Sequence, residues 1–77
     1  MTIKEKLFAL RKDFTLKTDT YFKADKRLFD EGNGFFDNKL LTDLADAKEA
    51  WQKAGNAYNS LLSHVLNNRL NVDAEID

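Results

Sequence analysis

The stretch IKEKLFALRKDFTLKTDTYFKADKRL, residues 3–28, decides the fold, because its apolar side chains recur in alternating steps of four and three residues. This spacing is typical of a long α-helix that packs one face against another helix. One charged residue, Lys17, interrupts the series, and we expect its stem to lie along the helix pair while its ammonium reaches solvent. The positions in the series are Ile3, Leu7, Leu10, Phe14, Lys17, Tyr21, Ala24 and Leu28.

A second stretch, LLTDLADAKEAWQKAGNAYNSLLSHV, residues 40–65, repeats the same spacing. Its positions are Leu40, Leu44, Ala47, Trp51, Ala54, Tyr58, Leu61 and Val65. If the chain folds back at Gly34, each member of the first set meets one of the second, and their residue numbers always sum to 68. Large residues then meet small ones in three central layers, as a core of constant density requires. We call the two sets the inner seam, and it predicts an all-α fold of two antiparallel helices.

Local signals indicate where the two helices begin. Thr2 with Glu5 three residues later forms a capping box, which marks the start of a helix. Asp37 or Asn38 can cap the second helix in the same way. The expected helices span residues of about 3–31 and 37–71.

The remaining segments are a predicted turn between the helices and a C-terminal tail. The segment Gly32-Asn33-Gly34 is a turn signal, and the absence of proline suits two uninterrupted helices. Residues 72–77 are acidic, and we expect them to fray from the end of the second helix. Residues 1–77 are thus expected to form a single helical-hairpin domain.

Composition excludes several classes of function. Twelve basic and thirteen acidic residues leave no basic excess for binding nucleic acid. There is no cysteine, and the single His64 has no carboxylate within a turn, so we expect no catalytic, cofactor or metal site. No apolar run is long enough for a secretory signal or a membrane span, so we expect a cytoplasmic protein without membrane contact.

Large apolar residues also lie outside the inner seam, and the heptad places them on one side of the hairpin. We call this set the apolar flank: Phe8, Phe22, Phe29, Leu41, Ala45, Leu62 and Leu66. The opposite side of the hairpin is polar. A hairpin with one apolar side is half of a four-helix bundle, which predicts a homodimer that pairs through the apolar flank.

The centre of the apolar flank is small or polar, with Thr15, Thr18, Gln52, Gly55 and Asn59. Small residues there would allow close approach of another helix, whereas a polar pocket at a subunit crossing is the alternative. Two further surfaces are candidates for partner binding. They are the hairpin tip, Phe35 and Phe36, and a polar recognition face of uncharged side chains, Asn56, Asn59, Ser63 and Asn67.

These patterns indicate a small non-enzymatic interaction or regulatory protein, an adaptor or an inhibitor of the kind that phages and mobile elements encode. It would bind itself and another protein through the apolar flank or the hairpin tip. An alternative is a self-assembling subunit of a filament or secretion apparatus. A third reading is an oligomer that sequesters a small anionic ligand near the polar centre of the flank.

Overall fold

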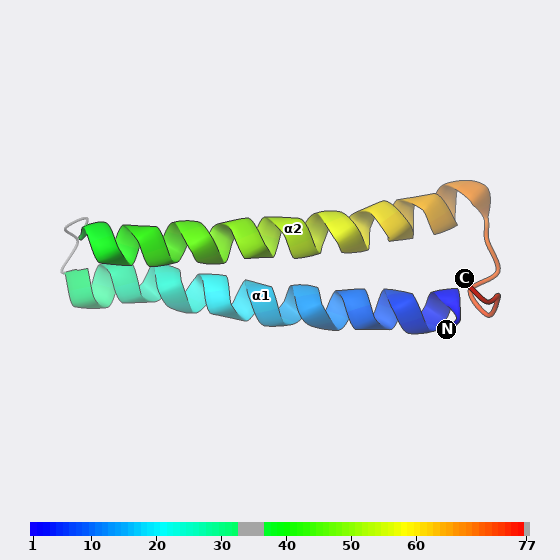
Figure 1. Ribbon diagram of the computed structural model, residues 1–77, viewed down its shortest axis with the longest axis horizontal. Coiled ribbons are helices and arrows are strands. Elements are labelled where there is room, and N and C mark those ends of the chain that lie inside the picture. The colour runs from blue at the N-terminus through cyan, green and yellow to red at the C-terminus, as the bar shows by residue number, and fades with distance from the viewer. Residues whose placement is uncertain (33–36, 77) are drawn as a thin grey trace.

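The computed structural model describes residues 1–32 and 37–76. They form two antiparallel helices, α1 (Ile3–Gly32) and α2 (Asn38–Asn68), which lie side by side along their whole length (Figure 1). The molecule measures 50 × 18 × 16 Å. The prediction of an antiparallel two-helix hairpin is confirmed.

Both predicted helix starts are present. The backbone N–H of Glu5 donates to Thr2 Oγ1 at 3.1 Å, and the Glu5 carboxylate accepts from the Thr2 backbone N–H at 3.2 Å. These hydrogen bonds lower the pKa of Glu5 below its ordinary value of 4.5. A lowered folded-state pKa means that the capping box stabilises the fold above pH 4.5. This contribution is lost as the pH falls through the lowered pKa.

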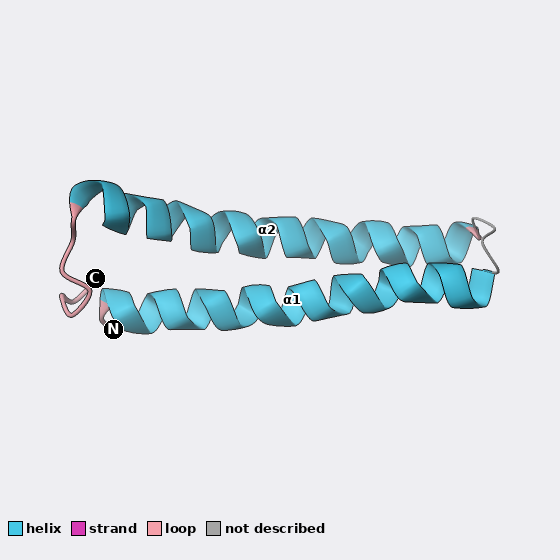
Figure 2. Cartoon of the chain, turned by 180° about the vertical axis from the view of Figure 1, so that it is seen from behind, coloured by secondary structure: helices cyan, strands magenta, loops and turns pink. Residues whose placement is uncertain are grey.

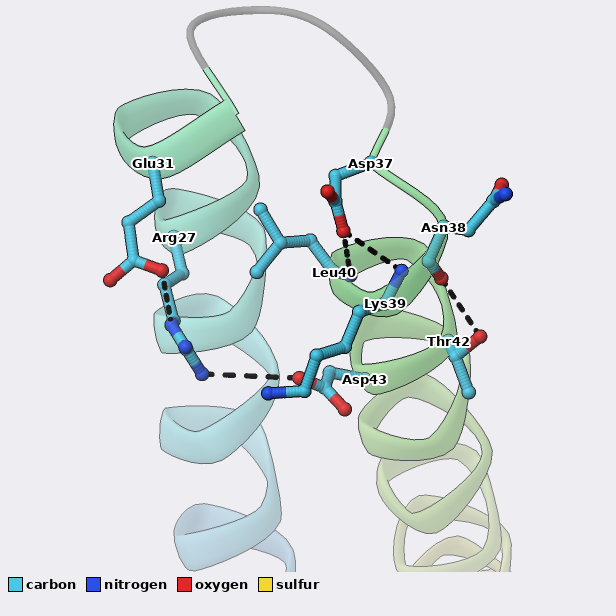
Figure 3. Close-up of polar contacts among 8 residues, drawn as sticks. All are labelled: Arg27, Glu31, Asp37, Asn38, Lys39, Leu40, Thr42 and Asp43. Carbon is cyan, nitrogen blue, oxygen red and sulfur yellow. Dashed lines mark hydrogen bonds and ion pairs between the residues drawn. The ribbon is translucent and has the colours of Figure 1, made fainter.

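At the turn end of the hairpin, polar contacts fix the start of α2 against the end of α1 (Figure 3). Asp37 is the N-cap, and its carboxylate accepts hydrogen bonds from the backbone N–H groups of Lys39 and Leu40. Arg27 of α1 pairs with Glu31 at 2.8 Å and reaches Asp43 of α2 at 3.9 Å. These charges are exposed, so they orient the helix ends more than they stabilise them.

The inner seam forms the interface between the helices, and none of its residues is exposed. Two predicted layers are buried on both sides, one at each end of the hairpin: Ile3 with Val65, and Leu28 with Leu40. In the middle, the Phe14 ring lies between Trp51 and Tyr58, at centroid distances of 6.4 and 6.3 Å. Phe14 therefore stands at the level of residues 54 and 55, as the sum of 68 predicts.

The helices lie closer together at the turn end than at the end that carries the termini, as both views show (Figures 1 and 2). Side-chain size explains the difference. Near the turn, Ala24 and Ala47 each take one side of a layer, whereas Leu10 meets Tyr58 nearer the open end. The distance between packed helices follows the size of the side chains at their contact.

The end of α2 differs from the prediction. The helix stops at Asn68 instead of continuing to residue 71, because Arg69 adopts the left-handed conformation with φ 48° and ψ 48°. The Arg69 and Leu70 backbone N–H groups both donate to the Val65 carbonyl, which closes the last turn. The chain then turns back toward the first residues of α1.

The acidic tail is also a correction, because residues 72–76 do not fray. They run back to the start of α1, where Ile3 N–H donates to the Ala74 carbonyl at 3.0 Å and Lys4 N–H to the Val72 carbonyl at 2.8 Å. Ion pairs join Lys4 to Asp73 and the Met1 ammonium to Glu75. The first N–H groups of a helix have no partner within it, and the tail supplies acceptors for two of them. Asp77 lies outside the described residues.

We expect truncation after Leu70 to expose these two amides. In hydrogen–deuterium exchange, the Ile3 and Lys4 amide protons should exchange roughly tenfold faster in the truncated chain, in line with the loss of one hydrogen bond each. Amide protons in the middle of α1, such as that of Phe14, serve as the internal control and should change little. Equal rates at Ile3 in both chains would show that the tail is not held in solution.

Candidate functional site

Most side chains of the apolar flank are uncovered in the hairpin. Phe8, Phe22, Phe29 and Leu66 are 72, 62, 65 and 66% exposed. Ala45 is exposed as well, whereas Leu41 and Leu62 are partly buried against α1. The structure thus leaves open to solvent most of the side chains that the heptad assigned to this flank. Exposed apolar residues that gather on one face are typical of an interaction surface.

A row of aromatic rings connects the inner seam to this flank. Trp51 stacks on Tyr21 with their ring centroids 4.9 Å apart, and Tyr21 in turn lies 5.8 Å from exposed Phe22. At the other end of the row, Phe14 joins Trp51 to Tyr58. The exposed Phe22 ring is therefore positioned by packed neighbours and does not stand alone on the surface.

The centre of the flank is hollowed on both sides of the Phe14 ring. A hollow of 550 Å³ is lined by Arg11, Phe14, Thr15, Thr18, Asp19 and Tyr58. A second hollow, of 220 Å³, is lined by Phe14, Trp51, Gln52, Gly55, Asn56 and Asn59. The small and polar residues that the sequence placed at the centre of the flank line these two hollows.

Gly55 has a different role from the one expected of it. It is buried, and a Cβ atom there would lie 3.0 Å from Phe14 Cε1, so the glycine allows the Phe14 ring to lie across α2. Gly55 therefore serves the contact within the hairpin and does not offer an open surface to another helix. Beside it, the buried Nε1–H of Trp51 has no hydrogen-bond partner within the described residues.

Charged side chains lie on both sides of the seam, and two of them, Arg11 and Asp19, lie beside the larger hollow. Lys17 is partly buried in the seam and its ammonium reaches Asp13 at 3.3 Å, in agreement with the expected outward path of this side chain. Asp19 pairs through one carboxylate oxygen with Lys23 at 2.9 Å. Arg11, at the rim of the 550 Å³ hollow, makes no ion pair within residues 1–32 and 37–76.

The other candidate surfaces are less informative. All four members of the polar recognition face are exposed, and Asn59 also lines the smaller hollow of the flank. The hairpin tip, Phe35 and Phe36, lies outside the described residues. The spacing did not indicate Leu16, which is 57% exposed on α1. Leu16 lines a hollow of 280 Å³ together with Phe8, Arg11, Lys12 and Thr15, so it borders the apolar flank.

His64 is exposed, and the Asn68 amide nitrogen lies 3.1 Å from its Nδ1 and donates to the His64 carbonyl. In the described ranges, no three His, Cys, Asp or Glu side chains gather as a metal site would require. Neither α1 nor α2, over the residues that the structure describes, combines the length and apolar character needed to cross a membrane.

Comparisons of this chain with known protein families, with curated proteins and with solved structures found no match.

Proposed function

We propose that this chain is a small non-enzymatic protein-interaction module, and that the apolar flank is the surface through which it packs against helices of another chain. The observation that carries the proposal is the exposure of Phe8, Phe22, Phe29 and Leu66 along one flank of the hairpin. Each aromatic side chain of this size contributes strongly to an interface when it is covered.

The thin core of the hairpin supports the same proposal. Among the described residues, only Ile3, Leu28, Leu40, Ala54 and Val65 form the buried apolar core, and no side chain is completely buried. A chain of 77 residues without disulfides must usually gain stability from a metal, a partner or a second copy. Covering the apolar flank would add a second layer to the core and would build a four-helix bundle.

The opposite side of the hairpin is polar, which favours packing of a partner on the apolar flank. Residues at the equivalent positions there include Lys6, Lys23 and Lys53, all exposed, and the i,i+4 ion pairs of Lys23 and Lys53 lie on the solvent side. Helices that are apolar toward both the seam and one flank, and charged elsewhere, are typical of bundle helices. Only one side of this hairpin therefore favours a helical partner.

The experiment that tests the proposal is light scattering after size-exclusion chromatography, over a hundredfold range of concentration. We expect a mass of twice 8.9 kDa that stays constant once the chain is associated. NMR spectra recorded over the same range should shift at flank residues such as Phe22 and Ala45, and not at Ser60 on the polar side. A mass of 8.9 kDa at every concentration, with unchanged spectra, would contradict the proposal.

The same measurement addresses the alternatives. Mass that grows steadily with concentration would indicate the filament subunit, which repeats a heterologous contact. The anion-binding reading has weaker support, because the 550 Å³ hollow is lined by one cation, Arg11, and one carboxylate, Asp19. This hollow has no excess of positive charge with which to select an anion.

A further inference from the structure

Over residues 8–22 and 41–66, the apolar flank has the same chemical order in both directions, whereas Phe29 lies beyond this symmetric part. On α1, Phe8 and Phe22 each lie seven residues from Thr15. On α2, the flank is apolar at both ends and small or polar between them. Its residues in order are Leu41, Ala45, Lys48, Gln52, Gly55, Asn59, Leu62 and Leu66.

The two midpoints lie at the same level of the hairpin. The α2 series is centred between Lys53 and Ala54. In the register of the inner seam, residue 53 lies opposite Thr15 of α1. The structure agrees, since Phe14 lies across Gly55 and stacks between Trp51 and Tyr58. A rotation of 180° about an axis through the flank at this level therefore superposes apolar ends on apolar ends and the hollowed centre on itself.

We propose that the occupant of the apolar flank is a second copy of this chain in the reverse direction, related by a twofold axis at the level of Thr15. This inference rests on the proposed function and specifies the partner. The two turns then lie at opposite ends of the bundle, and α1 packs antiparallel to the α1 of the partner. Phe8 of each copy meets Phe22 of the other, so this aromatic contact occurs twice.

Charges on α1 favour this direction. Arg11 and Asp19 lie on the rim of the same hollow and are equally far from Thr15, so the rotation brings Arg11 to Asp19 of the other copy. This opposite-charge contact occurs twice, which gives the interface electrostatic complementarity.

The arrangement with both turns at the same end lacks these contacts. It would place α1 against the partner's α2, with Arg11 opposite residues near 57. No Asp or Glu occurs between Glu49 and Asp73, so the basic half of α1 would face a helix segment without a carboxylate. The reverse arrangement is therefore the one that pairs the charges.

The size of the flank side is sufficient for a stable dimer. A face of 50 × 18 Å has a projected area of about 900 Å², and a specific interface buries about 800 Å² on each partner. The 550 Å³ hollow at its centre also leaves space for the threonine and Arg11 side chains of the opposing copy.

A single cysteine tests the axis, since the natural chain contains none. In Thr15→Cys, two copies of the new thiol lie at the axis, and mild oxidation should give a disulfide-linked dimer on non-reducing electrophoresis. A disulfide requires Cα atoms within about 7 Å of each other. In the arrangement with both turns at the same end, the two α1 helices lie diagonally across the four-helix bundle, so the two Thr15 positions are too far apart to be linked. Ser60→Cys, exposed on the polar side, is the matched control and should stay mostly uncrosslinked.

Charge reversal tests the contacts. Arg11→Asp and Asp19→Arg should each raise the dimer dissociation constant about tenfold, and the double variant should restore it to within a few fold of the natural chain. A dimer that forms in solution without a Thr15→Cys crosslink would overturn the inference and leave the proposed function standing. A chain that remains monomeric at every concentration would overturn both.

Discussion

Phe22→Asp is expected to abolish association through the apolar flank while the hairpin itself stays folded. Phe22 is 62% exposed in the single chain, so the substitution removes little packing within the hairpin. In the associated form it would place a carboxylate in a desolvated contact, where the loss of one aromatic anchor alone costs about 2 kcal/mol or more. The dissociation constant should therefore rise at least about 30-fold, and light scattering should report the monomer mass.

Ser60→Asp is the control for this experiment. Ser60 is exposed on the polar side of the hairpin, so a carboxylate there stays in solvent. This variant should keep the mass of the natural chain. Circular dichroism should show two helices of unchanged content in both variants, and an unchanged mass for Phe22→Asp would show that the flank is not the interface.

The association and the fold are linked through the aromatic row. Phe22 stacks on Tyr21, and Tyr21 stacks on Trp51 in the inner seam, at centroid distances of 5.8 and 4.9 Å. Covering Phe22 therefore extends a packed row that already crosses the hairpin. For this reason we expect the melting temperature of the natural chain to rise with protein concentration, as it does when the folded state is also the associated state.

The parts of the fold that the sequence predicted depend on local or periodic signals. The capping box of Thr2 and Glu5 and the N-cap at Asp37 each need only a few neighbouring residues, and both are present. The inner seam needs only a regular spacing, which two uninterrupted helices preserve over their whole length. Exposure of the apolar flank followed from the same heptad.

The parts that were missed depend on contacts between distant residues. The return of the tail rests on hydrogen bonds from Ile3 and Lys4 to residues near the other end of the chain. The composition of the tail, acidic and weakly apolar, is equally that of a solvated end. The early end of α2 was not predicted, because the residue in the αL conformation is Arg69 and not the glycine that usually marks such a helix end. The alternation of Val72, Ala74 and Ile76 with acidic residues is the sequence signal that favours an extended tail.

The position of the Phe14 ring was also predicted only in part from the sequence. Heptad letters place Phe14 opposite Ala54, and this layer is correct to within one residue. The ring also covers Gly55, because the glycine has no side chain to hold it away. The Phe14 ring lines both hollows of the flank at this level.

Ala54→Leu is expected to lower the free energy of unfolding by about 1–3 kcal/mol. Ala54 is 8% exposed, and its layer is already filled by the Phe14 ring between Trp51 and Tyr58. A leucine there adds three carbon atoms between helices that small residues hold close together, so either the ring or α2 must move. The effect is large for a small domain, whose total stability is about 5–15 kcal/mol.

Urea unfolding followed by circular dichroism measures this change as a lower midpoint with an unchanged slope. Ala57→Leu is the matched control, because Ala57 is exposed on the same helix and the substitution there should alter the stability by less than about 0.5 kcal/mol. Both variants must be compared at one protein concentration, since association contributes to the stability of each. If Ala54→Leu were as neutral as its control, Ala54 would not face the Phe14 layer, and the register that sums to 68 would be wrong. The twofold axis at Thr15 would then fail with it, because its level is set by the same register.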